Sequence, residues 1–160
     1  VHPQKHLVPI KLAAPKAGAA AHALRALNMR PEVVGDRVGA ASTIKMLRSV
    51  MIKGLEALVA ECFLAARRAG VEDQVIASLE ASDPDIAWRK RGAYNMERMM
   101  VHGVRRAAEL REVAKTVEGL GLYPGLSRAT AEWQDIVAAT RADPGADDLI
   151  ARLDGVLARL

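Results

Sequence analysis

Three cationic side chains lie on one side of residues 42–56, a segment that is otherwise mostly apolar. At 100° per residue, one sector of a helix over this segment would contain Ser42, Lys45, Arg48, Ser49, Lys53 and Glu56. Glu56 is the only carboxylate in the sector, which therefore holds three cations and one anion. Such a group is tolerated best when an external anion neutralises it. We therefore expect this sector to bind a small anionic substrate.

Lys45 is the residue of this sector that is best suited to proton transfer. Neighbouring positive charge disfavours the protonated form of a lysine and moves its pKa toward neutrality. A lysine with such a pKa can act as a general acid or base. The alternative is a solvated helix face, which is the more frequent environment of lysine side chains.

The elements that would position these residues are mainly helical. A strand over residues 7–13, a helix over 16–27 and an extended segment around Val33 and Val34 form a short α/β piece. Beyond Asp36 no further strand is expected, and the apolar spacing predicts helices over residues 37–69, 72–81, 86–119, 126–141 and 146–160. We predict a mainly α protein in which residues 1–36 and 37–160 form two segments.

Several residues are expected to punctuate these helices. Gly70 is placed to end the long helix as a C-terminal glycine cap. The stretch "SDPD" at residues 82–85 offers a capping residue and an early proline, so it is expected to begin the next helix. Gly92 and Gly103 are candidate breaks within that helix.

The composition excludes several function classes. Hydrophobic residues make up 51% of the chain and aromatic residues only 3%, which favours helices packed through small aliphatic side chains. The net charge of +4 is dispersed, so no nucleic-acid partner is expected. No apolar run could cross a bilayer, and the single cysteine, Cys62, permits no internal disulfide, so we expect no membrane partner and a cytoplasmic protein. His102 lacks a second ligand, and no metal site is expected.

Three stretches carry a resemblance to a known superfamily. They are "VVGDRVG", "GAASTIKM" followed by "IKG", and "MVHGVRRAAELREVAKTVEGLGLYP". They resemble the β-hydroxyacid dehydrogenase and phosphogluconate dehydrogenase superfamily, in particular the branch with the NAD-binding phosphogluconate dehydrogenase C-terminal domain. The similarity runs from about Val1 to Val137. It implies that residues 1–36 end a Rossmann-type domain and that residues 37–160 form a helical substrate-binding and dimerisation domain.

The resemblance implies roles for residues near the start of the long helix. The superfamily has Gly-x-Gly before a catalytic lysine and an asparagine about one turn after it. Gly39 matches the first glycine and would lie near the cofactor, Lys45 matches the lysine, and Ala41 replaces the second glycine. Ser49 stands in place of the asparagine. Ile52 stands where decarboxylating members have a glutamate, which implies interconversion of alcohol and carbonyl without decarboxylation.

Further substrate contacts are expected from the cationic sector and from the same resemblance. Arg48 and Lys53 would orient the substrate carboxylate. The segment "VHPQ" is similar in placement to the substrate loop of the family, and His2 would take the position of its substrate-binding serine.

The stretch "RRAAEL" resembles the Lys-Asp-Leu motif of the family. Glu109 and Leu110 match the last two residues, whereas Ala108 takes the lysine position. Arg105 or Arg106 would then supply the positive charge. The alternative is a solvated helix face on which Arg105 and Glu109 form an i, i+4 pair.

The resemblance implies a fragment of an NAD(P)-dependent oxidoreductase that transfers a hydride between nicotinamide and a small hydroxy acid. Because no G-x-G-x-x-G turn follows a strand, NAD or NADP is expected to bind mainly upstream of Val1, and this chain alone is expected to be inactive. A homodimer is expected. The alternative function is a non-catalytic helical dimerisation or interaction module, because helices rich in Ala, Met and Leu also form subunit interfaces.

Overall fold

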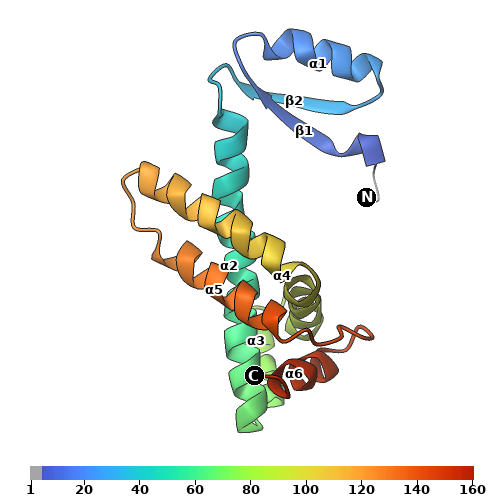
Figure 1. Cartoon of the computed structure of the whole chain (residues 1–160). Coiled ribbons are helices and arrows are strands. Elements are labelled where there is room, and N and C mark those ends of the chain that lie inside the picture. Colours follow the sequence, from blue (N-terminus) through green and yellow to red (C-terminus); the bar gives the residue numbers. More distant parts are fainter. Residues whose placement is uncertain (1–4) are drawn as a thin grey trace. The chain divides into compact units, whose positions relative to one another are not determined.

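The computed structural model describes residues 5–160 and confirms a mainly α protein (Figure 1). After a 3-10 turn at Lys5–Leu7, the elements are β1 (Pro9–Ala13), α1 (Ala17–Ala26), β2 (Arg30–Gly35), α2 (Ala40–Ala69), α3 (Glu72–Ser82), α4 (Trp88–Gly119), α5 (Gly125–Ala139) and α6 (Leu149–Leu157). None of these helices is long and apolar enough to span a membrane, within the part of the chain that is described.

The chain divides into two compact units, and the first extends to Arg48. In this unit β1 and β2 pair in parallel, with Ile10 opposite Pro31 and Leu12 opposite Val33. Helix α1 connects the two strands, as parallel pairing requires. The strand–helix–strand arrangement expected from the sequence is therefore present.

The second unit begins at Ser49, within α2, and contains the main hydrophobic core. Helix α4 packs against both α5 and α6, and Figure 1 shows α4 and α5 side by side. The largest fully buried apolar side chains are Phe63, Met96, Met99, Leu110 and Leu153. The sequence analysis places the end of a Rossmann-type domain at residue 36, and this domain boundary stays a prediction.

The end of α2 follows the sequence expectation. Helix α2 ends at Ala69, and Gly70 adopts a φ of +70°, which glycine reaches without a steric penalty. The N–H of Val71 donates to the carbonyl of Ala66 at 3.0 Å, and the N–H of Gly70 donates to Arg67 at 3.2 Å. These two bonds form a Schellman motif, so the predicted glycine cap is confirmed.

The predicted start of the next helix at "SDPD" is wrong. Ser82 is the last residue of α3, where its Oγ donates to the carbonyl of Ser78 at 3.0 Å. The hydroxyl is thus used within its own helix. Helix α4 begins six residues later, at Trp88, and Ala87 provides no side-chain cap.

Gly92 and Gly103 do not break α4, which runs without interruption through both. A Cβ at Gly92 would lie 2.6 Å from the Phe63 ring, and one at Gly103 would lie 2.5 Å from the carbonyl oxygen of Gln134. Both glycines therefore permit close packing of α4 against its neighbours.

Gly103→Ala is expected to lower the free energy of unfolding by about 1–3 kcal/mol, because the added methyl group overpacks the contact between α4 and α5. Gly119→Ala is the matched control, since a Cβ at that end of α4 meets no atom within 4 Å. It should be neutral or stabilise by up to about 1 kcal/mol. Urea unfolding followed by circular dichroism measures both, and equal stability of the two variants would contradict the packing argument.

Candidate functional site

An ion-pair group connects α2 with α4 through three residues that the sequence analysis selected. The Nζ of Lys53 donates to Oε2 of Glu109 at 2.6 Å, and Nη1 of Arg105 donates to Oε1 of the same carboxylate. The Lys53 side chain is only 6% exposed, whereas that of Arg105 is 60% exposed. The Glu109 carboxylate thus forms an ion pair with one buried cation and one solvent-exposed cation. The expected i, i+4 pair between Arg105 and Glu109 is present, with Lys53 added from a second helix.

The environment of Glu109 favours its ionised form. Partial burial raises the pKa of a carboxyl group, and this is the largest single effect. The hydrogen bond and charge of Lys53, together with Arg105, act in the opposite direction and outweigh it. The pKa of Glu109 is therefore held below its ordinary value, and the residue is suited to fixing Lys53 in place.

A second charged group lies deeper between α2, α4 and α5. Glu56 accepts hydrogen bonds from Nε of Arg106 at 2.9 Å and from Nε2 of Gln134 at 2.8 Å, and Arg106 Nη2 donates to its other oxygen. All three side chains are buried. The charge of Glu56 is thus neutralised by Arg106 from α4.

This buried group was missed in the sequence, although one signal was available. Arg106 follows Gly103 by three residues and precedes Leu110 by four, so it belongs to the buried side of α4. A buried arginine requires an anionic partner. Arg106 is consequently committed to Glu56, and Arg105 remains the arginine of "RRAAEL" that solvent reaches.

The other predicted site residues lie elsewhere. Lys45 and Arg48 are exposed residues of α2 within the first unit, and Ser49 is a half-buried residue at the start of the second. Gly39 precedes α2 with a φ of +92°, a conformation that favours glycine. His2 lies outside the described residues. The assigned roles of these residues stay predictions.

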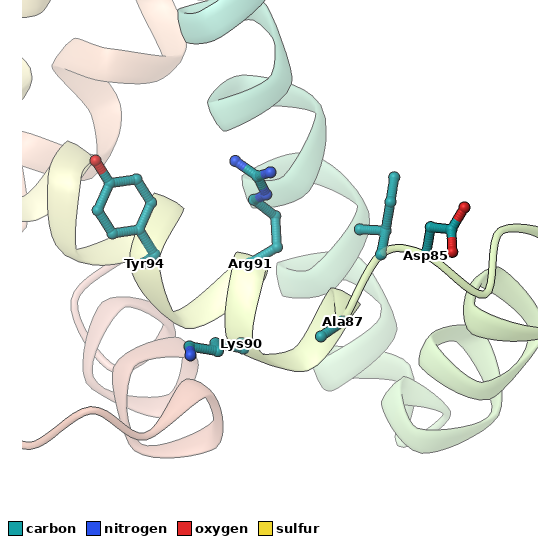
Figure 2. A pocket seen from close by; sticks show the side chains of 6 residues that line it. Asp85, Ala87, Lys90, Arg91 and Tyr94 are labelled. Atoms are coloured by element: carbon teal, nitrogen blue, oxygen red, sulfur yellow. The ribbon is translucent and has the colours of Figure 1, made fainter.

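A hollow of about 320 Å³ occurs where α4 begins, away from the predicted residues. Figure 2 shows Arg91 and Tyr94 extending from the same side of α4. The guanidinium of Arg98 lies 6.0 Å from the centre of the Tyr94 ring. The residues that line the hollow are Asp85, Ile86, Ala87, Lys90, Arg91 and Tyr94.

A second hollow, of about 390 Å³, lies farther along α4 and is lined in part by His102, Arg105 and Ala138. Burial and the positive charges of Arg98 and Arg105 lower the pKa of His102. A neutral imidazole is thereby favoured at this position. Among residues 5–160, no three His, Cys, Asp or Glu side chains are grouped so that they could hold a metal ion.

Two solved structures share the fold of this chain. A conserved hypothetical protein from Sinorhizobium meliloti 1021 matches 97% of this chain with a TM-score of 0.88 and 39% sequence identity. The conserved protein MTH1747 matches 84% with a TM-score of 0.70 and 28% identity, and its structure reveals similarity with 3-hydroxyacid dehydrogenases. The chain has a hydroxyacid dehydrogenase-like fold. The superfamily resemblance found in the sequence is therefore confirmed.

Sequence comparisons match part of the chain to a domain family and to a curated protein. Residues 66–137 match a domain of unknown function, DUF1932. A 28.5 kDa protein in the 7S RNA 5′ region of Methanothermus fervidus is 34% identical over 104 residues, which cover 62% of this chain and 39% of that protein. The chain spans 53% of each of the two solved structures. The DUF1932 match contains Arg105 and Glu109, whereas Lys45 and Lys53 precede it.

The Glu109 contacts predict a pH-dependent contribution to stability. The folded-state pKa lies below the ordinary value of 4.5, so the ionised group stabilises the fold above that pH. The contribution disappears as the pH falls through the folded-state pKa. The difference in Tm between the wild type and Glu109→Gln should be largest near neutral pH and shrink in acid.

The control for this pH series is Glu132→Gln, which removes an exposed carboxylate of α5 that has no ion-pair partner among residues 5–160. Its Tm should follow that of the wild type at every pH. A Glu109→Gln difference that stays constant with pH would contradict the assigned electrostatic role.

The two neighbouring arginines of α4 should differ sharply in their effect on stability. Arg106→Met leaves the Glu56 carboxylate buried without its cation and should cost about 3–5 kcal/mol. Arg105→Met removes a solvated ion pair and should cost about 0–1 kcal/mol. Chemical denaturation measures both, and similar small losses would show that the Glu56 pair is not a structural requirement.

Proposed function

We propose that the chain is part of an NAD(P)-dependent oxidoreductase that transfers a hydride between nicotinamide and a small hydroxy acid. The observation that carries the proposal is the meeting of Lys53 with Glu109 and Arg105. These residues come from the two helices that hold the family-like stretches. The dehydrogenase-like fold of the chain supports the same assignment.

Lys45 is assigned the proton transfer. In the direction of alcohol oxidation, the Lys45 side chain would accept the hydroxyl proton, and a bound nicotinamide would supply the hydride acceptor for the carbon that bears the hydroxyl. The carbonyl forms as the C–H and O–H bonds break, and the reverse reaction returns the proton from the Lys45 ammonium. Ser49, one turn later, is assigned a hydrogen bond to the substrate.

The cations of the site are not equally available to a substrate carboxylate. Lys53 is buried and already paired, so a carboxylate binds it only in exchange with Glu109. Arg48 and Arg105 are exposed, and a substrate can reach them without breaking a buried contact. We therefore assign the carboxylate to Arg48, which lies three residues after Lys45 on α2, and give Lys53 and Glu109 a positioning role.

Residues 5–160, which the structure describes, do not form a complete dinucleotide site. The turn between β1 and α1 is "APK" at residues 14–16, without a glycine that would let a pyrophosphate approach the backbone. We assign the main NAD or NADP site to a part of the protein outside this chain. Cys62 as the single cysteine supports a cytoplasmic reaction.

The test is an assay of the complete gene product with small 2- and 3-hydroxy acids, using NAD and NADP. Lys45→Met is expected to lower kcat about 10²- to 10⁴-fold, which is the usual contribution of a general acid or base. Lys90→Met removes an exposed cation of α4 outside the site and should leave kcat unchanged. Near-normal kcat in Lys45→Met would refute the assignment.

The second candidate function is a non-catalytic helical dimerisation module. It is favoured by large exposed apolar side chains on α2, which include Met51 and Leu58. Dimerisation is compatible with catalysis. Absence of turnover with every hydroxy acid, in a protein that forms a stable dimer, would favour this alternative.

A further inference from the structure

The hollow of about 320 Å³ at the start of α4 has a lining that local contacts hold in place. This lining comes from residues 85–87, in the linker after α3, and from the first two turns of α4. Within these turns, Gly92 lets α4 approach the Phe63 ring of α2. In the linker, the N–H of Ile86 donates to the carbonyl of Asp83 at 3.1 Å. The hollow is therefore a preformed space of a size that small molecules occupy.

The six arginines of α4 divide into two groups by their partners. Four of them form ion pairs with carboxylates, namely Arg89, Arg105, Arg106 and Arg111. Arg91 and Arg98 form no ion pair with any of residues 5–160. Arg91 precedes Tyr94 by three residues and Arg98 follows it by four, so all three lie on the same side of the helix. The two arginines without an ion pair thus flank one aromatic ring.

The Tyr94 ring is supported by protein and yet accessible. Its side chain is exposed enough to line the hollow, and the residue is 54% exposed. The guanidinium of Arg98 lies over the ring at 6.0 Å from its centre, and the Nε of Arg98 is buried without a hydrogen-bond partner among residues 5–160. Because Arg98 occupies one face of the ring, a ligand in the hollow meets the remaining surface of Tyr94.

The charged groups of the lining select the sign and number of charges on a ligand. Figure 2 shows Arg91 between Tyr94 and Asp85, whereas Lys90 extends away from Arg91 and Tyr94. A guanidinium binds a carboxylate through two parallel hydrogen bonds, and a flat ring is the best partner for the exposed tyrosine ring. Asp85 repels a second negative charge beyond Arg91. These features fit a molecule with one carboxylate and one aromatic end.

We propose that the hollow is a binding site for a small aromatic monocarboxylate, whose carboxylate pairs with Arg91 and whose ring packs against Tyr94. Ile86 and Ala87 supply further apolar lining for the ring. An inorganic anion would use Arg91 alone and leave the apolar part of the hollow unfilled. The site shares no residue with the one assigned to hydride transfer, so the proposal does not rest on the chemistry of Lys45.

The test is a titration of para-fluorobenzoate with the complete gene product near neutral pH, followed by fluorine NMR. The wild type should bind this probe with a Kd of about 0.1–1 mM, as is usual for a ligand of this size. Arg91→Met should weaken binding about 10- to 100-fold, because a charge-assisted contact is lost. Lys90→Met is the matched control and should change the Kd less than about twofold. Absence of binding to the wild type, or equal effects of the two variants, would overturn the proposal.

Displacement of the bound probe tests the aromatic part and the location of the site. Benzoate should displace it better than cyclohexanecarboxylate by about 2- to 10-fold, and Tyr94→Leu should remove this preference. Displacement by inorganic phosphate as efficient as that by benzoate would indicate a simple anion site and overturn the proposal. Lys45→Met should leave the Kd of the probe unchanged. Loss of binding in Lys45→Met with retention in Arg91→Met would place the probe at the site assigned to hydride transfer, which also contradicts the proposal.

Discussion

The buried carboxylate of Glu56 is the constraint on which the packing of the second unit depends. An ionised carboxylate in the interior is tolerated only with a full set of donors. Arg106 and Gln134 supply them from α4 and α5. Because each donor has to reach the same carboxylate, α2, α4 and α5 are fixed relative to one another at this level. The contact between Lys53 and Glu109 follows the same alignment of the two helices. Lys53 lies three residues before Glu56 on α2, and Glu109 lies three residues after Arg106 on α4.

Close approach of the helices is the second requirement of this arrangement. Gly103 lets the backbone of α5 approach α4, and Gly92 accommodates the Phe63 ring. Both positions lie on the buried side of α4. The glycines therefore act through the absence of a side chain, while α4 keeps its regular hydrogen bonding through both.

The charge contacts also define what the candidate site can do. Glu109 neutralises Lys53, so the buried lysine is a fixed part of the contact between α2 and α4. Arg105 shares the same carboxylate from the solvent side. Binding of an anion to Arg105 would therefore change the electrostatic environment of Glu109 and, through Glu109, that of Lys53. This linkage gives the site an electrostatic connection from solvent to the interior of the helical unit.

The sequence by itself determined the local elements and the relationship of the protein. The glycine after Ala69 predicted the end of α2, and apolar spacing predicted the helices, because both signals act between neighbours in the chain. The family-like stretches around Lys45 and Glu109 indicate the dehydrogenase-like fold from the sequence alone. The tertiary structure alone decided that Glu56 pairs with Arg106 and that Lys53 pairs with Glu109. These partners are 50 and 56 residues apart, and no local pattern specifies which charges meet when helices pack.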